Sequence, residues 1–439
     1  MSRLPPIGAA VMTAATVRQV FVLSAIVRSG CFLRTKTGSH GNLCPAPQFF
    51  IVVPVLREAA LLRDAVAHLG DVARGQAATV VVVTTAREAA EAHHYPAAAD
   101  TVRVADQLAR EGMCVHLHYP DPLGVKADQL NYAVATCAGM LPAGTPTSQA
   151  FAMCYDADSR PPVDSLDSFA AAIASNPAAD VFHQSSRFEL RLQSPAPKRL
   201  SMAVCDAGAL RANRFVLGFE IPRLLNRSPH ASAIKRVLCA GVYAHVTGHG
   251  LCVRLSLLQR LPFPARSPLE DMHYSFILGS RGLPMVPVPS LDATEVPSTV
   301  TAQFQQAARW FFGPARVARY LADPATHPGW RATTMAASAL GSAAEWIGCA
   351  VVPALACVLI ATGSRSVRTA AVLFVTVCGV QVVLVERWLG APGRLEDRLS
   401  RVVCFPLACA VHGVGGAAGA VRLMTGGSGA GKTERTRQA

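Results

Sequence analysis

Acidic residues are missing from the first 57 positions of this 439-residue chain, in which the first carboxylate is Glu58. Asp, Glu, Lys and Arg are all missing from three later stretches, each about as long as a helix that crosses a bilayer, namely Trp346–Thr362, Thr369–Val385 and Val402–Val421. Buried core helices are the alternative. Three such stretches in succession, separated by loops that carry arginine, favour membrane spans.

The N-terminal segment is also apolar, apart from Arg18 and Gln19 within Ile7–Val27. A secretory signal peptide is the alternative, but Arg18 interrupts the apolar run and no small-x-small cleavage site follows it. We expect residues 1–48 to form a basic segment that lies at the membrane surface or spans it weakly. Its basic residues would favour the anionic cytoplasmic leaflet.

Paired cysteine motifs are missing as well, since none of the 13 cysteines belongs to a C-x-x-C pair. This indicates reduced, packed thiols and therefore a cytoplasmic main domain. The net charge of +13 is dispersed, and no recognition-helix or ribonucleoprotein pattern accompanies it. Membrane lipids and a pyrophosphate substrate are therefore the expected partners, and nucleic acid is not.

Apolar, β-branched runs alternate with stretches of helical periodicity after residue 48, which predicts a mostly parallel sheet in an α/β fold. The expected strands are Phe49–Val55, Ala78–Thr85, Met113–Tyr119 and Ala150–Tyr155, and the expected helices are Glu58–Leu69 and Lys126–Cys137. Ligands of such sheets bind beyond the carboxyl ends of the strands.

Two carboxylates, Asp156 and Asp158, end the fourth strand in the sequence FAMCYDADSRPP. Spaced i, i+2 at a strand end, they could hold a divalent cation against a phosphate. The alternative is an Asx turn, in which Asp satisfies loop amides. Arg160 follows in the same turn and suits either interpretation.

The segment PDPLGVKADQLN leads from turn residues into a helix and places Lys126 and Asp128 in its first turns. An ordinary helix start with exposed side chains explains it equally well when the segment is taken alone. Beside the two acids, Lys126 would supply positive charge for a phosphate, and Asp128 could accept a hydrogen bond from a nucleobase or sugar.

SPLEDM at 267–272 fits a helix start, with Ser267 as N-cap, Pro268 at the first helical position and Glu270 as the partner in a capping box. This leaves Asp271 unexplained, and it could act as a general base. Upstream, glycines flank His249, which indicates a tight loop against a ligand. His245 lies four residues before His249, but no third zinc ligand is evident.

Gln306, Arg309 and Trp310 fall on one face of a helix predicted over Thr301–Tyr320. A guanidinium for phosphate and an indole for a sugar would then point the same way. The alternative is an interfacial helix, with tryptophan at the membrane surface and arginine among lipid headgroups.

Together these segments resemble the membrane-bound family 2 glycosyltransferases, which include cellulose, hyaluronan and chitin synthases. The resemblance covers Phe49 to about Trp310 and depends on four ordered motifs, KADQLN at 126–131, DAD at 156–158, LED at 269–271 and QAARW at 306–310. It implies a GT-A fold, of the Rossmann-like α/β class, followed by transmembrane helices.

The resemblance also implies the chemistry. An inverting transfer would move a sugar from a nucleoside-diphosphate sugar to a polysaccharide or lipid-linked hydroxyl, with Asp271 as base. Mg²⁺ or Mn²⁺ would be held by Asp158 and Asp156, and the donor would also contact Lys126 and Asp128. The acceptor or the pyrophosphate would contact His249, Glu270, Gln306, Arg309 and Trp310.

One departure concerns Thr84 and Thr85, which stand where the family usually has an Asp for the nucleobase. It leaves a catalytically silent, glycosyltransferase-like scaffold or nucleotide-sugar-binding protein as the alternative. At the other end of the chain, GGSGAGKT at 426–433 has phosphate-loop spacing but lacks a following helix, which favours a flexible tail.

The expected organisation has four parts in an integral protein of the cell membrane. They are a basic segment at 1–48, a cytoplasmic GT-A domain at 49–325, a membrane region of about three helices at 326–424 and a tail at 425–439.

Overall fold

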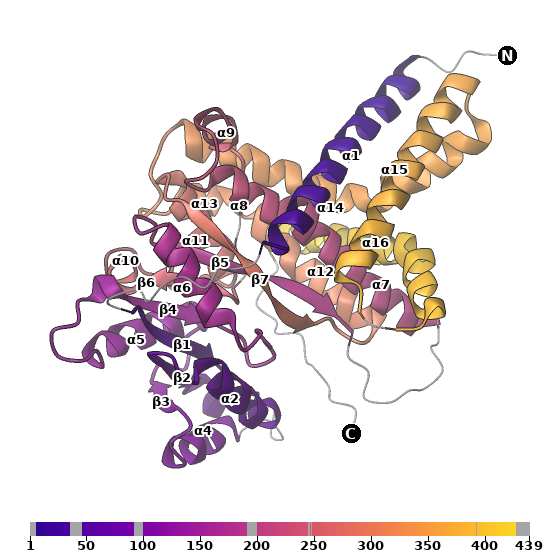
Figure 1. Ribbon diagram of the computed structural model, residues 1–439. Coiled ribbons are helices and arrows are strands. Elements are labelled where there is room, and N and C mark those ends of the chain that lie inside the picture. Colours follow the sequence, from indigo (N-terminus) through magenta and orange to yellow (C-terminus); the bar gives the residue numbers. More distant parts are fainter. Residues whose placement is uncertain are drawn as a thin grey trace.

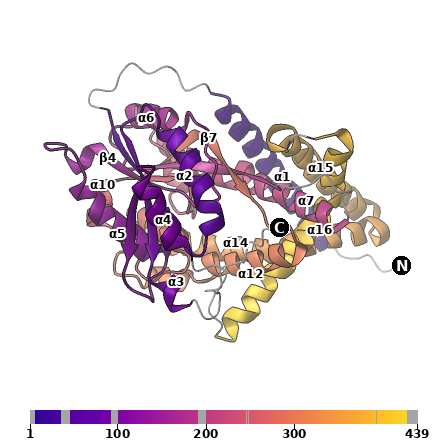
Figure 2. The same ribbon diagram turned by 90° about the horizontal axis from the view of Figure 1, so that it is seen from below.

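The computed structural model describes residues 6–35, 46–91, 100–190, 200–244, 246, 248–391 and 393–426. Within these residues, one sheet with its covering helices forms one end of the molecule, and long helices form the other (Figure 1). Seen from below, the helices α12 (Val300–Ala315) and α14 (Trp330–Thr362) lie between the sheet and α16 (Leu395–Met424) (Figure 2).

The sheet has seven strands in the order β3-β2-β1-β4-β6-β5-β7, and β6 alone among them is antiparallel to its neighbours. The strands are β1 (Gln48–Pro54), β2 (Ala78–Thr85), β3 (Val115–Tyr119), β4 (Ala150–Cys154), β5 (Val181–Glu189), β6 (Leu251–Arg254) and β7 (Met285–Glu295). The predicted α/β fold with a mostly parallel sheet is therefore confirmed. The four predicted strands correspond to β1–β4.

Helices cover both faces of this sheet, and each strand contributes alternate side chains to the two layers. Phe50 and Val52 of β1 pack with α5, whereas Phe49, Ile51 and Val53 pack with α2, α4 and α6. The central strands are buried on both sides, which explains their uninterrupted apolar sequences.

The helices between the first strand and the membrane region are mostly short. They are α2 (Ala59–Ala73), α3 (Arg87–Ala90), α4 (Thr101–Arg110), α5 (Lys126–Gly139), α6 (Ser165–Ser175), α7 (Leu200–Phe215), α8 (Ile221–Arg227), α9 (Ala233–Cys239), α10 (Leu255–Arg260), α11 (Glu270–Ser280), α12 (Val300–Ala315) and α13 (Val317–Leu321). A 3-10 turn, Thr147–Gln149, precedes β4, and a π-helical turn, Val216–Glu220, joins α7 to α8.

Four described helices are long and apolar enough to cross a membrane, as judged by length and composition. They are α1 (Pro6–Leu33), α14 (Trp330–Thr362), α15 (Arg365–Leu389) and α16 (Leu395–Met424). Each of the three predicted C-terminal spans lies within one of α14, α15 and α16. The N-terminal segment supplies the fourth helix, and α1 packs along α15 in both views (Figures 1 and 2).

Two predicted helix boundaries are wrong. The helix expected over Thr301–Tyr320 is two helices, because α12 ends at Ala315, directly after Pro314, and α13 starts at Val317. The helix expected to be capped by Ser267 begins only at Glu270, with Leu269 in the N-cap position. Of the C-terminal tail, only residues 425 and 426 lie within the described residues.

Candidate active site

A cavity of about 2590 Å³ lies beyond the carboxyl ends of β1, β2 and β4 and extends to the long helices. Nine of the ten predicted site residues line it, namely Lys126, Asp156, Asp158, His249, Glu270, Asp271, Gln306, Arg309 and Trp310. These residues come from segments almost two hundred positions apart. The sheet topology therefore brings all four motifs to one site, in agreement with the rule for parallel sheets.

Lys126, the first residue of α5, forms the centre of the charged part of this cavity. Its Nζ atom lies 2.6 Å from Oδ1 of Asp156 and 3.5 Å from Oε1 of Glu270, and it donates to the carbonyl of Gly248 at 3.1 Å. Burial alone would lower the pKa of Lys126, but the attraction of Asp156 and Glu270 outweighs it and raises the pKa. Lys126 is therefore a permanent cation that links three segments.

Glu270 and Asp271 occupy the first turn of α11, where the helix dipole favours negative charge. Both side chains reach the loop at Gly248, since a Cβ atom placed on Gly248 would lie 3.1 Å from Oε1 of Glu270 and 3.4 Å from Oδ2 of Asp271. The capping explanation for Glu270 is wrong, because Ser267 does not cap the helix and Glu270 lies at the cavity instead.

Burial changes the protonation of both acids. It raises the pKa of Glu270 to about 7, although the Lys126 cation opposes the rise. It also raises the pKa of Asp271 above its usual value, with Lys126 again acting in the opposite direction. A carboxylate with a raised pKa is a stronger base than an ordinary one. The pair therefore combines a proton acceptor with a neighbouring acid that titrates near neutral pH.

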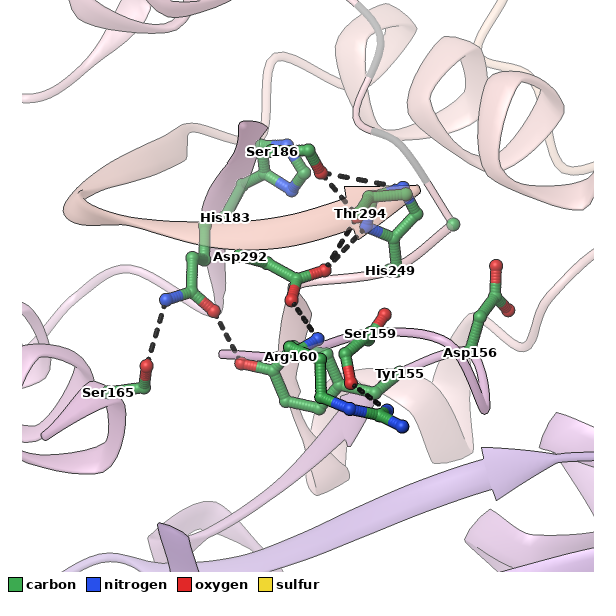
Figure 3. Close-up of polar contacts among 12 residues, drawn as sticks. Tyr155, Asp156, Ser159, Arg160, Ser165, His183, Ser186, His249, Asp292 and Thr294 are labelled. Carbon is green, nitrogen blue, oxygen red and sulfur yellow. Dashed lines mark hydrogen bonds and ion pairs between the residues drawn. The ribbon is translucent and has the colours of Figure 1, made fainter. Parts of the chain in front are cut away.

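Two buried side chains, those of Asp292 and Ser186, contact the imidazole of His249 (Figure 3). Its Nδ1 atom lies 3.1 Å from Oδ2 of Asp292 and 3.0 Å from Oγ of Ser186. Burial alone would lower the pKa of His249, but the hydrogen bond and charge of Asp292 raise it. Sequence analysis missed both partners. A carboxylate in the interior of the β7 sequence MVPVPSLDATE was the available signal for Asp292.

Asp292 also fixes the loop that carries the paired acids (Figure 3). Its Oδ1 atom accepts a 2.7 Å hydrogen bond from the backbone N–H of Arg160, and Arg160 exchanges two further backbone hydrogen bonds with Ala293. The guanidinium of Arg160 donates to the carbonyls of Ala157 and Ser159. The loop that carries Asp156 and Asp158 and the His249 loop therefore share one buried carboxylate.

Asp128 is the predicted site residue that the structure does not bring to the cavity wall. Its Oδ2 atom accepts from the N–H of Val125 at 2.9 Å, and its Oδ1 atom accepts from the N–H of Arg266 at 3.3 Å. In the third position of α5, its carboxylate returns to the amide that precedes the helix. The nucleobase contact predicted for Asp128 is not supported, and the residue stabilises the start of α5.

Thr84 and Thr85 differ in their surroundings although they are adjacent at the end of β2. Thr85 lines the cavity. The Oγ1 atom of Thr84 instead lies 2.7 Å from Nε2 of His116 and 2.9 Å from Nδ1 of His118 in β3. Of this pair, Thr85 is therefore the residue that lies at the cavity.

Gln306, Arg309 and Trp310 of α12 share the face that lines the cavity. Burial lowers the pKa of Arg309, while the charges of Asp156, Asp271 and Glu270 act in the opposite direction, so its guanidinium lies in the field of these acids. Trp310 packs against the same buried cluster as Val402 and Phe405 of α16. This helix face therefore faces the cavity and the interior of the protein.

The two carboxylates after β4, Asp156 and Asp158, are the residues that could hold a metal ion at this site. No group of three or more His, Cys, Asp or Glu side chains that could hold a metal ion occurs among the described residues. Oxygen ligands suit Mg²⁺ and Mn²⁺, and Mg²⁺ typically takes one or two carboxylates and completes its shell with substrate phosphate and water. Asp156 and Asp158 fit this pattern. The alternative zinc ligand His245 lies outside the described residues.

Residues 225–385 match the family model described as "Glycosyl transferase family group 2". The match includes His249, Glu270, Asp271 and the Gln306–Trp310 segment, and it excludes the Lys126 and Asp156–Asp158 segments. No curated protein matches the chain.

Among solved structures, the chain is similar to "Mannosyltransferase PcManGT from Pyrobaculum calidifontis in complex with GDP-Man and Mn2+". The two share 17% sequence identity with a TM-score of 0.49, over 93% of this chain and 98% of the other.

Proposed function

We propose that this chain, of which residues 225–385 match a family 2 glycosyltransferase model, is a glycosyltransferase that transfers a sugar, with inversion, from a nucleoside-diphosphate sugar to a hydroxyl group of a membrane-associated acceptor. The observation that carries the proposal is the convergence of Lys126, Glu270 and Asp271 on Gly248. Gly248, Glu270 and Asp271 lie in the part of the chain that matches the family model, and Lys126 lies outside it.

Asp271 is the proposed general base. Its Oδ2 atom faces the Gly248 loop within the cavity, while its Oδ1 atom accepts from the N–H of Met272 at 2.7 Å and is thereby oriented. As the acceptor oxygen bonds to the anomeric carbon, its proton passes to Asp271, and the bond from that carbon to the diphosphate oxygen breaks. One displacement of this kind inverts the anomeric centre.

Positive charge for the leaving diphosphate comes from the protein at two places. Arg309 lies in the field of Asp156, Asp271 and Glu270, and Lys126 pairs with Asp156 beside the predicted metal ligand Asp158. Such preorganised cations stabilise charge that develops as the bond breaks. A bound Mg²⁺ or Mn²⁺ at Asp158 and Asp156 would neutralise the same diphosphate charge.

The helix order supports a catalytic region beside the membrane. The sheet lies in the chain between α1 and α14, and the four long helices are long and apolar enough to cross a bilayer. We assign residues 49–325 to a cytoplasmic catalytic domain, because nucleotide sugars are cytoplasmic and the described cysteines of this domain form no disulfide bonds.

The test uses the full-length protein in detergent or nanodiscs. A panel of nucleotide sugars with Mn²⁺ is first screened by thermal shift, and the stabilising donor is then used in a turnover assay. Asp271→Asn should keep donor binding and reduce turnover about 10²- to 10⁴-fold, the usual contribution of a general base. Asp158→Asn should lose metal-dependent donor binding.

Asp164→Asn, which changes an exposed carboxylate near the same loop, is the matched control and should retain both properties. Full turnover by Asp271→Asn would refute the base assignment. If no nucleotide diphosphate or nucleotide sugar stabilised the wild-type protein, the proposed donor class would be wrong.

A further inference from the structure

The cavity is much larger than a nucleotide sugar requires. Its volume of about 2590 Å³ exceeds the range of roughly 300 to 1,000 Å³ that is usual for a small-molecule site. Beyond Trp310 it continues between α7 and the long helices, where it is lined by Cys349 and Val352 of α14, Phe374 of α15 and Phe405 of α16. We call this part the membrane-side chamber.

Two arginine side chains of α7 line this largely apolar chamber. Arg211 and Arg214 are three residues apart, so they lie on the same helix face. Arg211 makes no hydrogen bond or ion pair with any residue that the structure describes. Arg214 donates only to neutral amide oxygens, to Oε1 of Gln381 at 2.6 and 2.8 Å and to Oε1 of Gln19 at 2.7 Å.

These two cations carry an electrostatic cost. Burial lowers the pKa of Arg211 and of Arg214, and each nearby arginine lowers it further. The next cation in the chamber wall, Arg18, is paired with Glu345 at 2.5 Å, so that carboxylate is already engaged. A buried cation without a carboxylate partner is costly unless an anion is bound. The chamber is therefore suited to a negatively charged ligand.

Arg211 is also joined to the proposed catalytic segment. Arg211, Gln306 and Trp310 line one small recess, and all three also line the cavity that contains Glu270 and Asp271. An anion at Arg211 would thus lie next to the α12 motif. Apolar side chains of the long helices, including Val352 and Phe374, continue the chamber on the far side.

We propose that the acceptor is a lipid-linked sugar whose phosphate or pyrophosphate group binds Arg211 beside Arg214. Its sugar hydroxyl faces Asp271, and its apolar chain lies among α14, α15 and α16. This inference rests on the proposed function and names the acceptor class for the same site. A guanidinium is suited to the anion, because it can donate two parallel hydrogen bonds to phosphate oxygens.

The binding test uses the full-length protein in nanodiscs and follows the fluorescence of Trp310 and Trp346, which both line the cavity. The probes are an alkyl phosphate of about ten carbons, kept below its micelle concentration, the alcohol of the same chain length and inorganic phosphate. The alkyl phosphate should bind at least about tenfold more tightly than either of the other two. Equal binding of the alcohol would show that the anion is not recognised, and equal binding of inorganic phosphate would show that the lipid chain is not.

Arg211→Gln should weaken alkyl phosphate binding at least about tenfold, and Arg211→Lys should restore part of it. Arg422→Gln, at an exposed position near the end of α16, is the matched control and should bind as the wild type does. Thermal shift with the nucleotide diphosphate and Mn²⁺ should be unchanged in Arg211→Gln, which also shows that the variant is folded.

The thermal shift with nucleotide diphosphate and Mn²⁺ distinguishes the two proposals. If the nucleotide does not stabilise the wild-type protein, the proposed function is refuted, whatever the result with the alkyl phosphate. Normal nucleotide binding together with unchanged alkyl phosphate binding in Arg211→Gln would refute the acceptor assignment alone.

Discussion

The Nζ atom of Lys126 lies 2.6 Å from Oδ1 of Asp156, and this ion pair joins the start of α5 to the loop after β4. Helix α5 follows strand β3 and the Asp156 loop follows strand β4, and both strands belong to the parallel part of one sheet. Their carboxyl ends lie at the same edge of the sheet, so Lys126 and Asp156 meet although they are 30 residues apart in the sequence. The same Nζ atom lies near Glu270, and one cation therefore compensates carboxylates from two motifs.

Lys126→Met tests this compensation, because methionine keeps most of the apolar length of lysine and removes its charge. Loss of a charge-assisted hydrogen bond costs about 1.5–3 kcal/mol, so we expect the KM for the donor to rise roughly 10- to 100-fold. Steady-state kinetics with varied donor measures it. Lys235→Met, at an exposed position of α9, is the control. An unchanged KM in Lys126→Met would show that Asp156 does not need this partner.

Gly248→Ala tests whether the close approach at the His249 loop is required. The added Cβ atom would lie 3.0 Å from Nζ of Lys126, 3.1 Å from Oε1 of Glu270 and 3.4 Å from Oδ2 of Asp271. These are ends of side chains, which can shift by a few tenths of an ångström, so the fold should survive. We expect turnover to fall about tenfold, because small displacements of catalytic groups are costly.

The control for this substitution is Gly70→Ala in α2, where an added Cβ meets nothing within 4 Å. Alanine is the better helix former by about 1 kcal/mol, so Gly70→Ala should raise the melting temperature and leave turnover unchanged. Wild-type turnover in Gly248→Ala would mean that the acids tolerate rearrangement and that the observed spacing is not needed.

Much of this arrangement could be predicted from the sequence, since strand β2 has the predicted bounds and the four motifs meet at one cavity. Periodicity and strand-end rules suffice there, because buried parallel strands have uninterrupted apolar sequences. Strand β5 was not predicted, because its buried side chains His183, Gln184 and Ser186 are polar. Their hydrogen-bond partners are Glu220, Ser165 and His249, which lie in other segments, so no local pattern records these bonds.

The errors at the site have the same origin. Asp128 was assigned to a ligand, but its Oδ2 atom accepts from the nearby N–H of Val125 and its Oδ1 atom accepts from the N–H of Arg266, which is 138 positions away in the sequence. Asp292 was missed, because its importance comes from contacts with Arg160 and His249, which are distant in sequence. Side chains that hold a loop in place are identified only once the chain has folded.

Glu270 should make the stability of the protein depend on pH. Its pKa is raised from 4.5 to about 7, so between these values the folded chain holds a proton that the unfolded chain has released. Stability falls with rising pH wherever the folded state binds more protons. The Glu270 contribution therefore lowers the free energy of unfolding as the pH rises through this window and is constant above about pH 7.

Glu270→Gln removes this titration, so its melting temperature should fall less between pH 5 and pH 8 than that of the wild type. Thermal unfolding at several pH values in one detergent measures the difference. Glu396→Gln, an exposed position in the first turn of α16, should keep the wild-type profile. A wild-type slope in Glu270→Gln would assign the pH dependence to other groups.

Arg401 links three helices, because its side chain on α16 contacts side chains on α15 and α7. Its guanidinium donates to both carboxylate oxygens of Glu386 on α15, at 2.5 and 2.9 Å, and to Oδ2 of Asp206 on α7 at 3.3 Å. All three residues are buried. Removing one member of a buried ion pair typically costs about 3–5 kcal/mol, because the remaining charge is left uncompensated.

Arg401→Met should therefore lower the melting temperature of the full-length protein in nanodiscs by several degrees. Arg398→Met, three residues earlier and exposed, should change it little, since an exposed substitution usually alters stability by less than about 0.5 kcal/mol. The triple variant Arg401→Met, Glu386→Gln and Asp206→Asn provides a further check. If the cost of Arg401→Met comes from the uncompensated acids, neutralising both should recover part of the lost stability, whereas a still lower melting temperature would attribute the cost to lost packing of the arginine side chain.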